Sequence, residues 1–507
     1  MTLLARVLRR FGYAPIKRHG GFAGAFGGRT LSDWVTSAAG PNQELFASIA
    51  KLRDRARDLE KNNPLVRRYL HLVAENVVGP DGITLQVTAE NAPNPSGKIE
   101  AAYWDWGRPE TYSVDGRLGR AQFEQAVIRG IARDGEAFVR RVRTGDYGLS
   151  LQLLDPALVD EGFNRAPGDG LAAVKLGVEL DRWDRPLAYH VLSAHRHDTV
   201  GTPKAERVRI PADEILHLFV QRRPGQVRGE SWLAPVMVPL RMLDGYAEAE
   251  LFCARTAAQK MGFIVTKDAE SAPVTDADDT ARRTWEGSPG AIEELPVGQE
   301  FQQWDPTHPS QNFALFVTQV TKYVAAGLNV SFAALTSDLR EVNYSSSRIG
   351  LLQERDAWRA LQAWFADAFC EPVFREWRTA AFLKGKLPVR MTPERYTHRW
   401  QARGWEYTNP REEMVADALA IATGLRSPQQ IIAAKGGDAE EILDDIAAWQ
   451  QMAAARGVTL FVPNSVVDPD AQDPEGSAAS HGDDRPDGGT GRGGRPDSRV
   501  ALVRRAG

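Results

Sequence analysis

Histidine and carboxylate side chains gather in one stretch of the sequence, where they could ligate a metal ion. The candidates are His190, His195, His197, Asp198 and His217. His195 and His197 alternate along an expected strand or loop, so both could face one side. A metal site usually has further ligands and supporting hydrogen bonds, which makes packed or solvated histidines the more ordinary interpretation. A metal-dependent nucleic-acid-processing enzyme that uses the region from His190 to His217 stays open as an alternative.

Two common catalytic motifs are missing from the sequence. The phosphate-binding pattern GxxxxGK followed by Ser or Thr is absent. At Gly97-Lys98, the position of the first glycine holds Ala92 and the position after the lysine holds Ile99. The nucleophile pattern GxSxG begins at Gly229 but lacks its last glycine. We therefore predict no catalytic residues, no bound metal and no cofactor, and we expect that the chain is not an enzyme.

The composition is that of an ordinary globular protein. The 507 residues are 43% hydrophobic and 25% charged, with a formal net charge of −4. No run reaches the roughly 18 apolar residues of a membrane-spanning helix, and the net charge gives no basic bias for tight nucleic-acid binding. Cys253 and Cys370 fall in helical patterns and predict neither a disulfide framework nor a thiolate site. We expect an intracellular protein of roughly two to four domains without membrane contact.

Loop arginines leave a second alternative open. Arg222, Arg223 and Arg228 surround Pro224-Gly225 and could touch phosphates, although such clusters more often form surface ion pairs. A monomeric nucleic-acid-binding module would show itself by tight, salt-sensitive binding of a single subunit.

A short polar loop between two helical patterns organises the chain. The apolar stripe before the loop consists of Phe313, Phe316, Val320 and Val324. Gly327 and Asn329 predict the end of that helix. A second stripe runs from Leu351 to Phe369, and Pro372 predicts a kink or break. The side chains expected to be exposed in and beside the loop are Ser331, Thr336, Ser337, Asp338, Arg340, Glu341, Asn343 and Tyr344.

The strongest helical pattern runs from Pro239 to Met261, with Gly262 just beyond its end. Its apolar stripe consists of Leu240, Leu243, Ala247, Leu251, Ala254, Ala258 and Met261. The alanines would let neighbouring helices approach closely. Such a helix has faces left over after packing in its own subunit, so we expect the stripe to pack between subunits.

The part before Arg223 predicts an α+β domain with antiparallel sheet. Asn63-Pro64 suits the start of a helix that Gly79 ends. Ile83, Leu85 and Val87 alternate with polar residues as in a half-buried strand. Two strand pairs follow the aromatic run Tyr103–Trp106 and a helix, namely 136–143 with 149–154 and 174–180 with 187–192, and two further strands, 208–210 and 215–219, close the set.

The remaining segments are simpler. Residues 263–310 predict a loop-rich, partly acidic excursion. Met414–Ala422 and Ala439–Ala455 predict two small helices separated by Ser427-Pro428. The composition beyond residue 460, rich in Gly, Pro, Asp and Ser, predicts a disordered tail.

Several blocks of the sequence resemble lambda-type bacteriophage portal proteins. They are Leu52–Leu59 with Asn62-Asn-Pro64 and Asn76–Gly79, Ile210–His217, Arg223–Trp232, and Tyr323–Leu328 with Asn343–Arg348. The likeness covers roughly Asn42 to Glu406, in order. It implies an α+β portal-type subunit with an antiparallel-sheet wing, long stem helices, a clip insertion, a helical hairpin carrying the channel loop, and a helical crown.

Mapped by order, the resemblance divides the chain into nine segments. They are a flexible basic arm (1–41), a wing-like α+β domain (42–222), a loop and stem helix (223–262), a clip-like excursion (263–310), a second stem helix (311–327), a channel loop (328–347), a long helix with a return to the wing (348–410), crown-like helices (411–460) and a disordered tail (461–507).

The resemblance also implies a function and its partners. Portals form a homo-oligomeric ring, expected here to be a dodecamer, at one capsid vertex of the virion. A separate terminase packages double-stranded DNA through the ring, and the DNA later leaves the same way. In this family picture the channel-loop side chains would face the DNA, and they are Ser331, Thr336, Ser337, Asp338, Arg340, Glu341, Asn343 and Tyr344. Further implied partners are the terminase large subunit, a head-completion or adaptor protein, the scaffold and the major capsid protein, with assembly in the bacterial cytoplasm.

Overall fold

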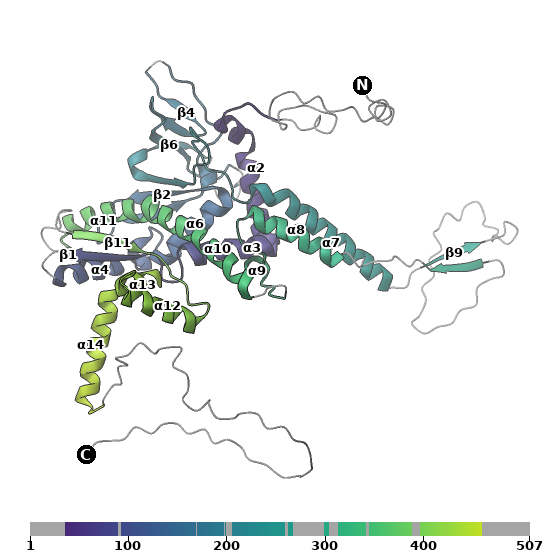
Figure 1. Cartoon of the computed structure of the whole chain (residues 1–507). Coiled ribbons are helices and arrows are strands. Elements are labelled where there is room, and N and C mark those ends of the chain that lie inside the picture. The colour runs from purple at the N-terminus through teal and green to yellow at the C-terminus, as the bar shows by residue number, and fades with distance from the viewer. Residues whose placement is uncertain are drawn as a thin grey trace, which may run out of the picture. The chain divides into compact units, whose positions relative to one another are not determined.

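The computed structural model describes residues 36–89, 93–168, 170–196, 198, 205–258, 262–266, 299–303, 313–340, 344–387 and 396–458 (Figure 1). The chain divides into two compact units, one of residues 1–408 with 432–439, and one of 409–431 with 440–507. The expected arm, apart from 36–41, and the expected tail lie outside the described residues. Across the described residues, no helix combines the length and apolar character needed to cross a membrane.

Helices α2 (Pro41–Asn62) and α3 (Pro64–Val77) open the larger unit. The predicted start of α3 is confirmed, because the Asn63 side chain accepts hydrogen bonds from the amides of Leu65 and Val66. Gly79 follows with a φ of 80°, a left-handed conformation that suits glycine after a helix end. One face of α3 is buried, with Val66, Tyr69, Val73 and Val77, and the helix packs against α6 (Arg120–Asp134).

An aromatic core forms where distant parts of the chain meet. Tyr103 and Trp106 lie within α4 (Pro93–Trp106), and Trp377 of α11 (Glu371–Leu383) contacts both rings. The short helix α5 (Pro109–Tyr112) adds Tyr112. The predicted strand at 83–87 is confirmed as β1 (Thr84–Ala89). Its partner β11 (Tyr396–Gln401) was not predicted, and the two strands pair antiparallel.

Two small antiparallel sheets stand beside this core. One has the order β3-β2-β8, with β2 (Glu136–Val142), β3 (Ser150–Leu154) and β8 (Ile215–Phe219). The other has the order β4-β5-β6-β7, with β4 (Ala173–Lys175), β5 (Val178–Leu180), β6 (Pro186–Leu192) and β7 (Arg207–Pro211). Short 3₁₀ helices lie at Pro156–Leu158 (η2), Ala212–Glu214 (η3) and Ala234–Val236 (η4). The antiparallel α+β prediction therefore holds for this region.

The prediction of one strand over 174–180 is wrong. Leu176 and Gly177 both have positive φ angles, 52° and 81°, and this left-handed pair folds the segment into a tight hairpin of β4 and β5. A Cβ at Gly177 would lie 2.6 Å from the Asp160 carbonyl oxygen, so the turn also needs glycine for space. The apolar alternation alone did not reveal this turn.

The second half of the larger unit is mainly helical. It contains α7 (Met237–Ala258), α8 (Phe313–Gly327), α9 (Phe332–Thr336), α10 (Tyr344–Phe365) and α11. A π-helical turn, Ala366–Cys370, joins α10 to α11. The predicted interruption near Pro372 therefore takes the form of a widened turn rather than a break, which accommodates a residue that cannot donate a hydrogen bond.

Three remaining findings correct the predicted boundaries. The first is that α7 starts two residues before Pro239 and extends to Ala258. Gly262 begins the strand β9 (Gly262–Thr266). The second is that β9 pairs antiparallel with β10 (Gln299–Gln303), where only loop was expected. The third is that Ser427-Pro428 begins a helix, α13 (Pro428–Ala434), between α12 (Pro410–Ala422) and α14 (Ala439–Ala455).

Candidate functional site

Helices α7 and α8 lie side by side and run in opposite directions (Figure 1). The ring centroid of Tyr246 lies 5.5 Å from that of Phe313 and 5.2 Å from that of Phe316. At the other end of α8, a Cβ at Gly327 would lie 2.6 Å from Val236 Cγ1, so glycine permits the close approach there. The two helices therefore form one antiparallel pair.

The base of this helix pair is fixed to the core of the larger unit. Leu240 and Leu243 are buried, and Asn63 Nδ2 donates to Asp244 Oδ1 at 3.0 Å. Asn63 thus caps α3 with its oxygen and holds α7 with its nitrogen. Val324 of α8 is also buried in the same core. The helix pair is therefore held to the subunit by residues buried at its base, and not by the whole predicted α7 stripe.

The outer part of the predicted α7 stripe lies on the surface of the subunit. Ala247 is exposed, Leu251 is 62% exposed, and Ala254 is partly buried. The side chain of Ala258 and all of Met261 lie outside the described residues. The sequence predictions also missed several large apolar residues that lie outside the predicted stripes of α7 and α8 and are exposed. Their positions on the helix faces outside the stripes could have indicated them. They are Val238, Met242, Phe252, Leu315 and Tyr323.

The first half of the predicted polar loop is folded structure. Ser331 caps α9 by accepting a hydrogen bond from the Ala334 amide, and Leu335 is only 2% exposed. Two outside contacts hold this turn, since Arg68 Nε donates to the Ala334 carbonyl and the Ser331 amide donates to Glu354. The expectation of a loop over all of 328–347 is therefore wrong, because Phe332–Thr336 form helix α9, whose Leu335 is buried in the core.

The exposed part of the segment begins at Ser337, whose φ of 59° turns the chain away from α9. Asp338 and Arg340 form a two-pronged ion pair, with Nε to Oδ1 at 3.0 Å and Nη2 to Oδ2 at 2.7 Å. The hydrogen bonds from Arg340 lower the pKa of Asp338 to about 2. Thr336 bonds back to the Phe332 carbonyl, and Tyr344 opens α10. Glu341 and Asn343 lie outside the described residues.

The candidate histidines do not come together as one set. His190 in β6 lies 3.3 Å from Glu179, His195 lies 3.5 Å from Asp155, and His217 in β8 lies 3.0 Å from Glu136. Burial lowers the pKa of His190 and of His217. His197 lies outside the described residues. Within the described part of the chain, no three His, Cys, Asp or Glu side chains are grouped to hold a metal ion.

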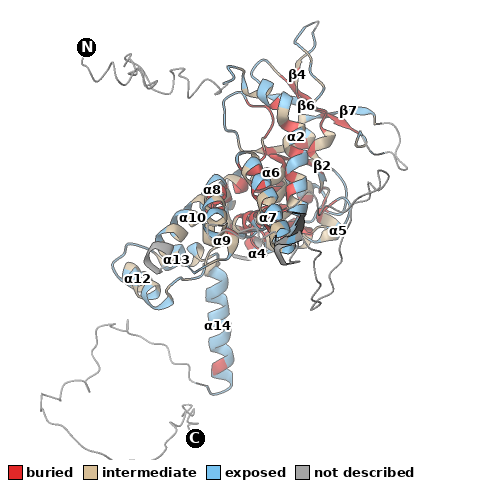
Figure 2. Cartoon of the chain, turned by 90° about the vertical axis from the view of Figure 1, so that its right-hand side faces the viewer, coloured by how far each residue is buried: buried red, intermediate tan, exposed pale blue. Residues whose placement is uncertain are grey.

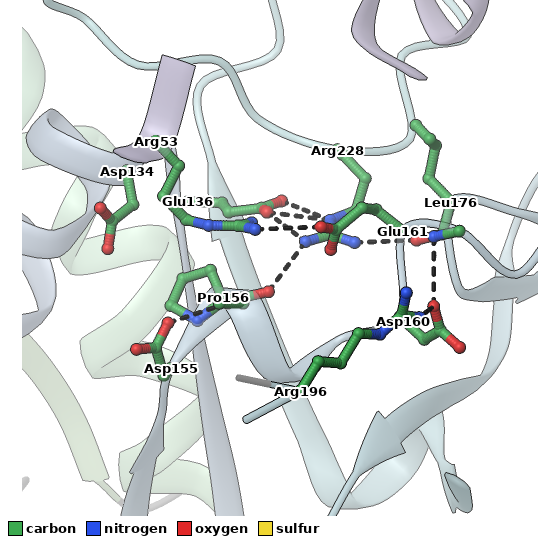
Figure 3. A network of polar contacts seen from close by, with 12 residues as sticks. Arg53, Asp134, Glu136, Asp155, Pro156, Asp160, Glu161, Leu176, Arg196 and Arg228 are labelled. Atoms are coloured by element: carbon green, nitrogen blue, oxygen red, sulfur yellow. Dashed lines mark hydrogen bonds and ion pairs between the residues drawn. The ribbon is translucent and has the colours of Figure 1, made fainter. Parts of the chain in front are cut away.

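The loop arginines form ion pairs, and one of them is fully buried. Arg223 pairs with Glu44 and Arg222 with Glu230 at the surface. Arg228 donates from Nε to Glu136 at 2.8 Å and from Nη1 to the Leu176 carbonyl at 2.8 Å (Figure 3). Burial alone would raise the pKa of Glu136, but Arg228 and His217 lower it to about 2. Arg228 thereby links the two sheets.

Comparison with known proteins finds a matching family and several similar proteins. The model of the family "Phage portal protein, lambda family" matches residues 27–362. A "Probable portal protein" of Halomonas phage phiHAP-1 is 31% identical over 435 residues, covering 82% of this chain and 84% of that protein. "Portal protein B" of Escherichia phage lambda is 22% identical over 477 residues, covering 84% and 87%. A chain of the solved "Neck of native GTA particle computed with C12 symmetry" has 16% identity and a TM-score of 0.44, covering 76% of this chain and 94% of that one.

The matched sequence places the chain in the class of phage portal proteins. The chain belongs to the lambda family of phage portal proteins. The resemblance seen in the sequence blocks is thereby confirmed.

Proposed function

We propose that this chain is one subunit of a ring that forms the DNA channel at a capsid vertex of the virion. A separate terminase motor drives double-stranded DNA inward through the channel, and head-completion proteins later dock on the ring. The observation that carries the proposal is the antiparallel pair of α7 and α8. Its base is buried in the subunit, while its outer part exposes large apolar side chains.

The exposed apolar side chains of α7 and α8 suit a contact with a neighbouring copy of the chain. Leu251 and Phe252 of α7 are 62% and 66% exposed, and Phe316 of α8 is 52% exposed. Large exposed apolar side chains gathered on one pair of helices are typical of protein interfaces. Because such a surface recurs on every subunit, a closed ring covers it on all copies at once. The outer part of the α7 stripe, with Ala247, Leu251 and Ala254, takes the subunit-packing role in this proposal, because Leu240 and Leu243 are already buried in the subunit's own core.

The loop segment 337–343, of which the described residues 337–340 are mostly exposed, is the segment that we place against the DNA. A channel that lets DNA slide must bind it weakly, because each neutralised phosphate adds affinity and salt dependence. The paired charges of Asp338 and Arg340 cancel, so they present a polar but nearly neutral surface. In the same proposal, residues 263–310 form the clip and residues 411–460 the crown. Nucleotide hydrolysis belongs to the motor, and the chain itself is not an enzyme.

A charge placed on the outer part of α7 should break the ring. We expect wild-type protein to show an oligomer of roughly half a megadalton or more, near the mass of twelve 55.9 kDa subunits. Leu251→Asp should yield folded monomer, because the exposed site tolerates the change within about 0.5 kcal/mol while a buried unpaired carboxylate disfavours the interface. Light scattering after size exclusion measures the mass.

The matched control is Trp183→Asp, at the exposed turn between β5 and β6, where the side chain is 70% exposed. This variant should keep the wild-type mass. A wild-type monomer at micromolar concentrations would contradict the ring.

The loop should affect DNA movement without affecting assembly. Replacing 337–343 by a Gly/Ser linker of equal length removes the Asp338–Arg340 pair but leaves Leu335 in place. We expect unchanged ring mass and a stability change within about 0.5 kcal/mol, because the replaced described residues are mostly exposed. In a packaging reaction with terminase, the variant should translocate slowly or let packaged DNA slip back. The same replacement at 181–185 should package normally, and equal packaging by both variants would count against the channel role.

A further inference from the structure

Helix α14 carries an apolar stripe that the described part of its unit leaves uncovered. Ile442, Ile446 and Trp449 recur every three or four residues and are 37%, 46% and 58% exposed. Leu443 and Met452 flank them and are also exposed. Figure 2 shows the helix exposed along most of its length, with one buried position near its end. A single helix of this length is only marginally stable without packing, so the stripe calls for an occupant.

The charge of α14 indicates what kind of occupant fits. The helix carries Glu440, Glu441, Asp444 and Asp445, and no Lys or Arg lies between Ala439 and Ala455. A second copy of α14 laid alongside would bring like charges together, which disfavours that pairing. A basic segment with apolar side chains would satisfy both the stripe and the charge.

The chain itself contains such a segment. Arg499–Arg505 reads Arg-Val-Ala-Leu-Val-Arg-Arg, with three arginines and no acidic residue. The stretch from Asp468 to Ser498 contains no Val, Leu, Ile, Met or aromatic residue. The apolar side chains of Val500, Leu502 and Val503 therefore stand apart from the composition around them.

The length of chain between the two segments permits the contact. About 40 residues separate Val458 from Arg499, and a stretch of that many residues is long enough to reach any point along α14. Helix α14 is only about 25 Å long at 1.5 Å per residue. A tether of this length also keeps the segment at a high effective concentration near the helix.

We propose that Arg499–Arg505 docks on the apolar stripe of α14. Val500, Leu502 and Val503 cover Ile446 and Trp449, and Arg504 and Arg505 lie near Asp444 and Asp445. The C-terminal segment would thus fold back onto the last of the crown-like helices. It does not depend on the channel role, because it concerns only α14 and a segment tethered to it.

Hydrogen exchange of the full-length protein tests the docking. Changing Val500, Leu502 and Val503 together to Ser should make the amides of residues 443–455 exchange about tenfold faster, because the helix loses its cover. The matched control changes Arg485, Arg492 and Arg495 together to Ser, which alters the intervening stretch and should leave exchange unchanged. Equal exchange in wild type and in the Val/Leu variant would overturn the proposal.

A charge swap separates this docking from general effects of the tail. Arg504→Asp with Arg505→Asp should speed exchange in α14, and adding Asp444→Arg with Asp445→Arg should restore slow exchange. No restoration would overturn the assigned arginine–aspartate contact. Protection that disappears on dilution but persists after residues 499–507 are removed would instead identify a second copy as the occupant. Ring mass, measured by light scattering on the same samples, reports separately on the proposed function.

Discussion

We expect Arg228→Met to lower the free energy of unfolding by about 3–5 kcal/mol, since removing one partner leaves the other as an unpaired buried charge. The side chains of Arg228 and Glu136 are both fully buried. Methionine keeps much of the arginine's length but leaves Glu136 with only His217 and the Gly229 amide as partners. The Leu176 carbonyl also loses the Arg228 donor, while the Pro156 carbonyl loses Arg228 but keeps the Val159 amide. Chemical denaturation followed by tryptophan fluorescence, at one fixed protein concentration, measures the loss.

The matched control is Arg223→Met in the same loop. Its ion pair with Glu44 is half exposed, so we expect a change below about 1 kcal/mol. A double variant, Arg228→Met with Glu136→Gln, should recover part of the stability, because it removes the unpaired charge. Similar losses for Arg228→Met and Arg223→Met would show that the buried pair has no special role.

The buried pair also predicts a pH dependence. The pKa of Glu136 is about 2 in the folded chain and 4.5 for the ordinary group. Because the folded value is the lower one, the ionised carboxylate contributes stability that is fully present well above pH 4.5. That contribution is lost as the pH falls toward 2, as the carboxylate becomes protonated. The difference in stability between wild type and Arg228→Met should therefore shrink over this acid range.

We expect Gly135→Ala to lower the free energy of unfolding by about 2–5 kcal/mol, combining a left-handed backbone cost with overpacking. Gly135 ends α6 with a φ of 97°. A Cβ there would lie 2.3 Å from the Glu230 carbonyl carbon and 2.6 Å from the Ser231 nitrogen. This backbone cannot easily move away, because the Trp232 amide donates to the Ala132 carbonyl at 3.1 Å.

The matched control lies in the same helix. Gly130 is inside α6, and a Cβ there would meet no atom within 4 Å. Gly130→Ala should raise stability by about 0.5–1 kcal/mol, since alanine favours the helix more than glycine does. The two Gly→Ala changes should thus have opposite signs in the same denaturation measurement. A loss for both would mean that the close approach at Gly135 is not the cause.

Local rules explain which predictions the structure confirms. The Asn63 cap, the end of α3 at Gly79 and the alternation at Ile83, Leu85 and Val87 depend on residues a few positions apart. The antiparallel pair of β2 and β3 follows from a short turn between two apolar runs. Each of these signals lies within one short stretch of sequence, so pattern alone was sufficient.

The candidate site shows where local pattern was insufficient. Periodicity placed Leu240 and Leu251 on one stripe, but the first is buried and the second is 62% exposed. Polarity suggested a loop around Ser331, yet Leu335 lies in the core because α9 packs against α3 and α8. The difference in each case comes from which surface another element reaches, and a pattern along one segment contains no information about that.

The sequence by itself determined most of the longer helices, most of the strands and, through its ordered blocks, the portal family. Only the tertiary structure decided that β1 pairs with β11 some 300 residues away, and that Arg228 lies buried against Glu136 between two sheets. Secondary structure follows from contacts between near neighbours. The pairing of distant strands and the burial of a charge depend on free energies summed over elements that meet only in the folded chain.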